Sequence, residues 1–179
     1  MGLALIHDRD ALVAALRDRG VDYLMPTDAQ GDPVGDEPLI ASLAANEDPR
    51  LRQALIALFL LHPELAPLAP ELRKTLGPET EIELVANYMA AVYLRQIWAT
   101  RLSHYLPALA PLPDFFSQSL QLPSPQAGFG EPGLRALASW HAHNGHERGN
   151  HCAEYENVAD LLFGRLALKV RAHVSAAAR

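Results

Sequence analysis

Leucine and alanine together supply 59 of the 179 residues, and this bias constrains the fold more than any other feature of the chain. Both residues have a low free-energy cost in a helix, so the bias favours helices over strands. Hydrophobic residues make up 49% of the chain, which is enough for one folded core and excludes disorder over most of the length. The sequence therefore predicts an all-α fold, a single-domain bundle of about six helices.

We expect residues 1–179 to form this one domain from four consecutive segments. These are an acidic N-terminal segment (1–50), a helical core (51–106), a proline-rich strap (107–133) and C-terminal helices (134–174). Between residues 21 and 34, an Asp-x-x-Gly stretch separates two short apolar pieces, which predicts a small β-hairpin.

Two long helices are expected to form the centre of the bundle, Leu51–Leu61 and Thr80–Leu106. Asp48 followed by Pro49 is a typical helix start, and the unbroken apolar run 54–61 predicts a helix buried on most faces. Thr80, with Glu83 three residues later, matches a capping box and predicts the start of the second helix.

The last helix is expected to span Ala153 to Val174. Five residues at helical spacing are expected to face the core: Tyr155, Val158, Leu162, Leu166 and Val170.

The net charge of −6 belongs entirely to the first fifty residues, which hold ten acidic and four basic side chains. This segment is either a solvated acidic surface or a docking face for a basic partner or another subunit. The acidic balance disfavours nucleic acid, but the neutral remainder leaves that partner open for the C-terminal part. No apolar run reaches the ~20 residues needed to span a bilayer and no leader pattern is present, so we expect a cytoplasmic protein without membrane contact.

Four histidines and the only cysteine fall within twelve residues. They are His141, His143, His146, His151 and Cys152. Imidazole and thiolate are the ligands that zinc and other transition metals prefer, so these five residues are the candidate metal ligands. Their spacing matches no established zinc pattern, and the alternative is a solvent-exposed, histidine-rich loop between two helices.

A second candidate site lies at the start of the same stretch. Arg135 is followed six residues later by His141, ahead of the last helix. This spacing resembles the Arg…His motif of HEPN domains, which are small all-α proteins that include toxin ribonucleases. The resemblance implies that Arg135 stabilises a phosphate and that His141 acts as acid or base in RNA cleavage. Ala136 stands where those domains usually carry a polar residue.

No nucleophile elbow and no glycine-rich phosphate loop is found in the sequence. We therefore expect a non-enzymatic interaction or regulatory protein without a cofactor, as a subunit of a toxin–antitoxin or defence-type assembly. The alternatives are a histidine-rich metal-binding protein or metal-dependent enzyme, and a HEPN-like ribonuclease using Arg135 and His141.

Overall fold

A computed structural model describes residues 4–24, 33–108, 110–145 and 149–177 of the chain. These residues form eight α-helices and two short 3₁₀ helices, Pro63–Leu65 and Ala127–Gly130, and contain no strand. The α-helices are α1 (Arg9–Asp18), α2 (Asp36–Ala44), α3 (Pro49–Leu61), α4 (Leu68–Arg73), α5 (Pro78–Ile97), α6 (Ala99–Tyr105), α7 (Glu131–Asn144) and α8 (His151–Ala177). The predicted all-α fold is confirmed, whereas the expected number of six helices is too low.

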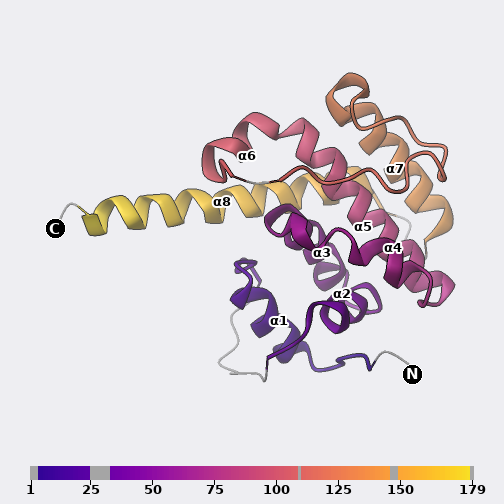
Figure 1. Cartoon of the computed structure of the whole chain (residues 1–179), viewed down its shortest axis with the longest axis horizontal. Coiled ribbons are helices and arrows are strands. Elements are labelled where there is room, and N and C mark those ends of the chain that lie inside the picture. The colour runs from indigo at the N-terminus through magenta and orange to yellow at the C-terminus, as the bar shows by residue number, and fades with distance from the viewer. Residues whose placement is uncertain (1–3, 25–32, 109, 146–148, 178–179) are drawn as a thin grey trace.

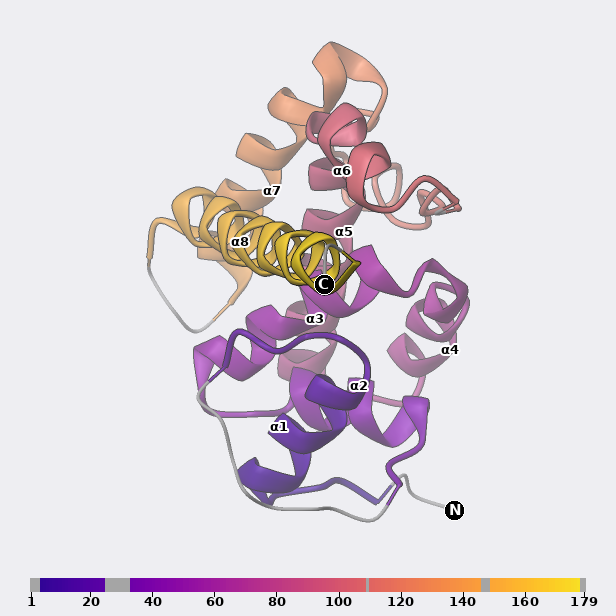
Figure 2. The same ribbon diagram turned by 90° about the vertical axis from the view of Figure 1, so that its left-hand side faces the viewer.

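The centre of the molecule is the packing of α3 against α5, around which the other helices are arranged (Figure 1). Asp48 caps α3 by accepting a hydrogen bond from the Arg50 amide at 2.9 Å, and Pro49 occupies the first helical position, as the sequence predicts. The apolar run is buried as expected, and Phe59 meets Tyr88 of α5 edge to face at 5.0 Å. Figure 2, which looks onto the C-terminal end of α8, shows α1 and α2 on one side of that helix and α6 and α7 on the other.

The expected Thr80–Leu106 helix is two helices, because the backbone leaves the helical conformation at Trp98. This break turns α6 towards α8, where Trp98 and Tyr105 pack around Phe163 with ring centroids at 5.7 and 6.3 Å. The long-range aromatic contacts accompany a bend that helical periodicity alone does not reveal.

Two further local predictions are wrong. The helix that was expected to start at Thr80 begins at Pro78, with Gly77 as its N-cap and no capping box. Glu83 instead points away from that end of the helix and into a polar cluster described below. Of the expected hairpin near residues 21–34, the described residues 21–24 and 33–34 contain no strand, and residues 25–32 lie outside the described part of the chain.

The proline-rich segment between α6 and α7 runs across α5. Two tyrosines of α5 hold it, with the Tyr88 hydroxyl donating to Pro113 O and the Tyr93 hydroxyl to Pro123 O, both at 2.7 Å. Gly133 of α7 lies directly against the Tyr93 ring, so that any side chain at this position would collide with it.

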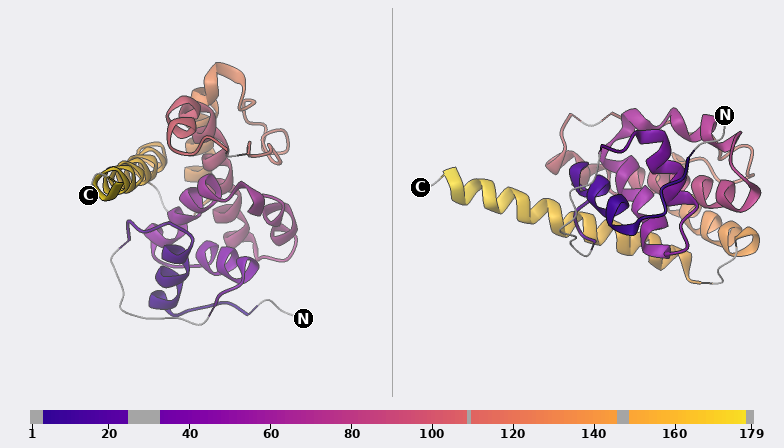
Figure 3. Two further views of the ribbon diagram at one scale, coloured as in Figure 1. Left: turned by 60° about the vertical axis from the view of Figure 1, so that its left-hand side comes forward. Right: turned by 90° about the horizontal axis from the view of Figure 1, so that it is seen from below.

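The last helix begins two residues earlier than expected and has two unlike parts. The α8 root (residues 151–166) packs against the body, and its last buried residue is Leu166. The α8 arm (residues 167–177) extends beyond the other helices (Figures 1 and 3). Val170, which was expected to face the core, is 46% exposed, because the body ends before the apolar periodicity of the helix does.

Among the described residues, no single helix is long and apolar enough to cross a bilayer. Two helical segments, Pro49–Leu61 and Pro63–Arg73, reach the length and apolar composition of a membrane span only when they are taken together. They are bent by 106° relative to one another.

Candidate functional site

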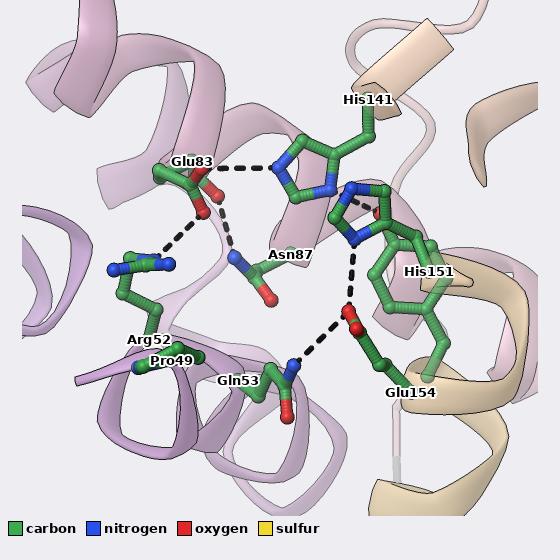
Figure 4. A pocket seen from close by; sticks show the side chains of 9 residues that line it. Pro49, Arg52, Gln53, Glu83, Asn87, His141, His151 and Glu154 are labelled. Carbon is green, nitrogen blue, oxygen red and sulfur yellow. Dashed lines mark hydrogen bonds and ion pairs between the residues drawn. The ribbon is translucent and has the colours of Figure 1, made fainter. Parts of the chain in front are cut away.

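A polar cluster lies where α3, α5, α7 and α8 meet (Figure 4). Its members line a small cavity inside the bundle, and most of them are buried although they are charged or polar. They are Arg52 and Gln53 of α3, Glu83 and Asn87 of α5, His141 of α7, and His151, Glu154 and Tyr155 of α8. Buried polar groups are unfavourable unless they are hydrogen-bonded, so each needs its partners accounted for.

Four of these side chains form a continuous chain of hydrogen bonds across all four helices. The Tyr155 hydroxyl lies 2.6 Å from His141 Nδ1, and His141 Nε2 lies 3.1 Å from Glu83 Oε1. The other carboxylate oxygen, Glu83 Oε2, accepts from Arg52 Nε at 3.1 Å. Arg52 also donates through Nη1 to the backbone oxygens of Asn46 and Glu47, at 2.7 and 3.0 Å.

His151 extends this chain at the start of α8. Its ring stacks on the His141 ring with centroids 4.1 Å apart, and its Nδ1 lies 2.9 Å from Glu154 Oε2. The same Glu154 oxygen accepts from Gln53 Nε2 at 3.3 Å. Each histidine of the stacked pair is therefore held by its own carboxylate.

The protonation of the cluster follows from these contacts. Burial raises the pKa of the Tyr155 hydroxyl, and the negative charges of Glu83 and Glu154 raise it further, so this group stays protonated where it meets His141 Nδ1. Burial alone would also raise the pKa of the Glu83 carboxyl. The hydrogen bond from His141 and the charges of His141, Arg52 and His151 outweigh burial and hold this pKa below its ordinary value.

At neutral pH the Tyr155 hydroxyl is thus protonated and the Glu83 carboxyl ionised, with His141 hydrogen-bonded to both, through Nδ1 and Nε2. Such a chain can hold or pass a proton. The cavity beside it has a volume of about 10 Å³, which is the space of one water molecule. Tyr155 is 1% exposed. In this conformation the cluster joins four helices and offers no room for an organic substrate.

The structure brings together only some of the candidate metal ligands. His141 and His151 stack, His143 is exposed at the end of α7, and His146 lies outside the described residues. Cys152 is half-buried. Burial, and to a lesser degree the charge of Glu156, raises the pKa of its thiol, although the charge of Arg135 acts in the opposite direction. The raised pKa disfavours the thiolate that zinc requires. In the described ranges, no three His, Cys, Asp or Glu side chains are grouped so as to hold a metal ion. Zinc binding stays a prediction.

Arg135 and His141 leave α7 in different directions, since six residues correspond to about one and two-thirds helical turns. Arg135 is exposed and donates to Glu131 Oε2 at 3.1 Å, one turn earlier on α7. His141 is 5% exposed and is bound to Tyr155 and Glu83. The two side chains of the HEPN-like motif are therefore not brought together around one cavity in this structure.

Sequence reasoning missed Glu83 and Tyr155 as partners of His141, and Arg52 as the partner of Glu83. Glu83 lies 58 residues before His141, and its Thr80–Glu83 spacing indicates a capping role that the helix does not use. The sequence contains one usable signal, which is that Arg52 and Glu83 each interrupt a mainly apolar helix.

Comparison of the chain with known family models, with curated proteins and with solved structures gives no match.

Proposed function

We propose that this chain is a non-enzymatic helical interaction protein whose docking surface is the α8 arm and whose partner is a second copy of the same chain. One observation carries the proposal. Beyond Leu166, no described side chain of α8 is buried, although the helix continues to Ala177.

A helix without tertiary contacts is only marginally stable in water, because most helical stability in proteins comes from packing an apolar face. The arm carries such a face. Leu168 is 55% exposed and Leu161, seven residues earlier on the same face, is 41% exposed, whereas Val170, 46% exposed, lies about 200° around the helix from Leu168. Gly164 lies between the two leucines on this face and has nothing within 4 Å of the position of a Cβ. Apolar anchors at this spacing are typical of a helix that docks against another surface.

Charge indicates which surface would receive the arm. Residues 161–179 contain four basic and no acidic side chains, whereas residues 1–50 carry a net charge of −6. The same complementarity already operates within the chain, since Asp22 lies 3.3 Å from Lys169 Nζ and 4.0 Å from Arg165 Nε. A second copy brings both an acidic segment and a basic arm, so two identical contacts related by a two-fold axis would satisfy both chains.

Sedimentation velocity over a range of protein concentrations tests this proposal. We expect reversible dimers that weaken as salt rises from about 0.1 M to about 1 M, where the screening length falls from about 10 Å to about 3 Å. Leu168→Asp should abolish the dimer, and Lys169→Glu should weaken it.

The other lysine of the chain provides the matched control. Lys74 is exposed and paired with Glu71 at 2.9 Å on α4, away from the arm, so Lys74→Glu makes the same change in net charge and should leave the dimer intact. A protein that stays monomeric at high concentration and low salt would overturn the proposal. So would a dimer that Lys74→Glu disrupts as strongly as Lys169→Glu.

A further inference from the structure

A second and larger cavity, of about 420 Å³, opens between the start of α1, the segment that follows α1, the first turn of α3 and the α8 root. Its volume lies in the range of small-molecule sites, roughly 300 to 1,000 Å³. It shares no residue with the α8 arm, and of the polar cluster only Gln53 also lines it. The cavity therefore has its own chemistry.

One wall of this cavity is apolar. Leu24 follows α1, while Val158 and Leu161 come from α8. Leu161 is among the most exposed large apolar side chains of the described residues, and it borders this opening. Tyr23 adds an aromatic ring to the lining, so these residues suit an aromatic ring or a branched hydrocarbon.

The lining also contains two arginines, Arg9 and Arg50. Arg50 has no ion-pair partner among the described residues, and Arg9 lies only within 3.8 Å of Asp10 and 3.9 Å of Asp48. Arg9 is the first residue of α1 and Arg50 the second of α3, so two helix N-termini, each the positive end of its helix dipole, border this cavity. The nearby carboxylates of Asp8 and Asp48 are engaged in capping those helices, by accepting from the Asp10 and Arg50 amides.

Tyr23 supplies a third feature that points to a ligand. Its hydroxyl oxygen is buried and has no hydrogen-bond partner in the part of the chain that the structure describes. Burial raises the pKa of this hydroxyl, so it stays a hydrogen-bond donor. An unpaired buried donor costs free energy, and an acceptor in the cavity would remove that cost.

We propose that this cavity binds a small amphipathic anion, a compact aromatic or branched apolar group that carries one carboxylate, sulfonate or phosphate. The anionic group lies against Arg9, Arg50 and the Tyr23 hydroxyl, and the apolar part lies against Leu24, Val158 and Leu161. Arg50 contributes most to the charge recognition, because no carboxylate of the described residues neutralises it. This site shares Leu161 with the apolar face of α8 used in the proposed self-association, but it contains no residue of the α8 arm.

Fluorescence titration with anilinonaphthalene sulfonate tests the site, since this dye joins an aromatic ring system to one anionic group. Phenylnaphthylamine, which has the rings without the sulfonate, is the neutral comparison. We expect saturable binding of the sulfonate at one site per chain and weaker binding of the neutral dye. Arg50→Gln should weaken the sulfonate about tenfold, equivalent to about 1.4 kcal/mol, and leave the neutral dye unchanged.

Two further variants keep the result interpretable. Arg135→Gln removes an exposed arginine from α7 and should change neither dye, whereas Leu161→Ser should weaken both. Leu168→Asp, which lies on the arm, should leave both titrations unchanged even where it abolishes the dimer. The proposal is overturned if the sulfonate does not bind, if Arg50→Gln and Arg135→Gln behave alike, or if Leu168→Asp removes the binding.

Discussion

Both parts of α8 contain residues that depart from the usual burial of apolar and exposure of polar side chains. The α8 root buries His151 and Tyr155, at 3% and 1% exposure, among charged partners from three other helices. The α8 arm exposes Leu168 and Val170, at 55% and 46%, and its polar contacts to the body run through Lys169, which lies 3.3 Å from Asp22 and donates to Gly20 O at 3.4 Å. Buried polar groups with defined partners fix the position of an element, and exposed apolar groups leave it ready to bind. One continuous helix therefore combines a buried anchor with the docking surface that we propose.

The largest expected effect comes from breaking the anchor at Glu83. Glu83→Ala removes the carboxylate that pairs with Arg52 and His141 inside the bundle. Loss of one partner of a buried ion pair costs about 3–5 kcal/mol, and we expect that loss in the free energy of unfolding by urea. Glu81→Ala is the matched control, because Glu81 pairs with Arg73 near the surface, where such a pair contributes less than about 1 kcal/mol. Equal losses in the two variants would mean that the polar cluster does not anchor the helices.

A pair of leucine substitutions compares the root with the arm directly. Leu162 is 1% exposed and Leu168 is 55% exposed, on the same helix and six residues apart. Leu162→Ala should lower the free energy of unfolding by about 2–5 kcal/mol, because it leaves a cavity in the core. Leu168→Ala should change it by less than about 0.5 kcal/mol in the monomer, as is usual for surface positions. Urea unfolding at low protein concentration measures both, and similar losses would contradict the distinction between root and arm.

The hydroxyl of Tyr155 is expected to have a smaller effect. Tyr155→Phe keeps the ring and leaves His141 Nδ1 buried without its 2.6 Å partner, which costs about 1–3 kcal/mol. Tyr105→Phe, in a half-buried tyrosine that packs on Phe163, should cost less than about 0.5 kcal/mol. The melting temperatures of the two variants separate the contribution of the hydrogen bond from that of ring packing. An unchanged melting temperature in Tyr155→Phe would show that the hydrogen bond does not stabilise the fold.

The smallest predicted effect is on the acid dependence of stability. The pKa of Glu83 is lower in the folded chain than its ordinary value of about 4.3, so the folded state favours the ionised carboxyl. The resulting stabilisation is fully present above that ordinary pKa and is lost as the pH falls through the folded-state pKa. Glu83→Gln should therefore lose less stability than the parent chain between about pH 4.3 and the acid limit of folding. Circular dichroism measures the unfolding of both proteins as a function of pH. The same pH dependence in the two proteins would refute the coupling between Glu83 ionisation and folding.

Local sequence signals predict those parts of the fold that local physics determines. Asp48 and Pro49 mark the start of α3 correctly, because a cap and a first-turn proline act within a few residues. The break at Trp98 is missed because its aromatic partner, Phe163, lies far along the chain on α8. The end of the core is missed for a related reason. The periodicity that includes Val170 continues after the body has ended, and periodicity alone does not tell an internal partner from an external one.

The candidate site shows the same division. His141 and His151, two of the five candidate metal ligands, come close because both lie near the turn between two adjacent helices. The partners that define their chemistry are Glu83, from α5, and Tyr155, one turn further along α8. The spacing of Glu83 to Thr80 favours a local capping role, and only the packed bundle reveals that its carboxylate serves a buried network instead.

Hydrogen exchange of α8, measured by mass spectrometry at low and high protein concentration, tests most directly whether one helix has an anchored root and a docking arm. We predict slow exchange of the root amides at both concentrations, because the buried cluster holds them in the monomer. The arm amides should exchange fast in dilute solution and become protected only as the concentration rises, with the protection lost again in high salt and in Leu168→Asp. Arm amides that exchange at the same rate at every concentration would contradict the proposed docking surface.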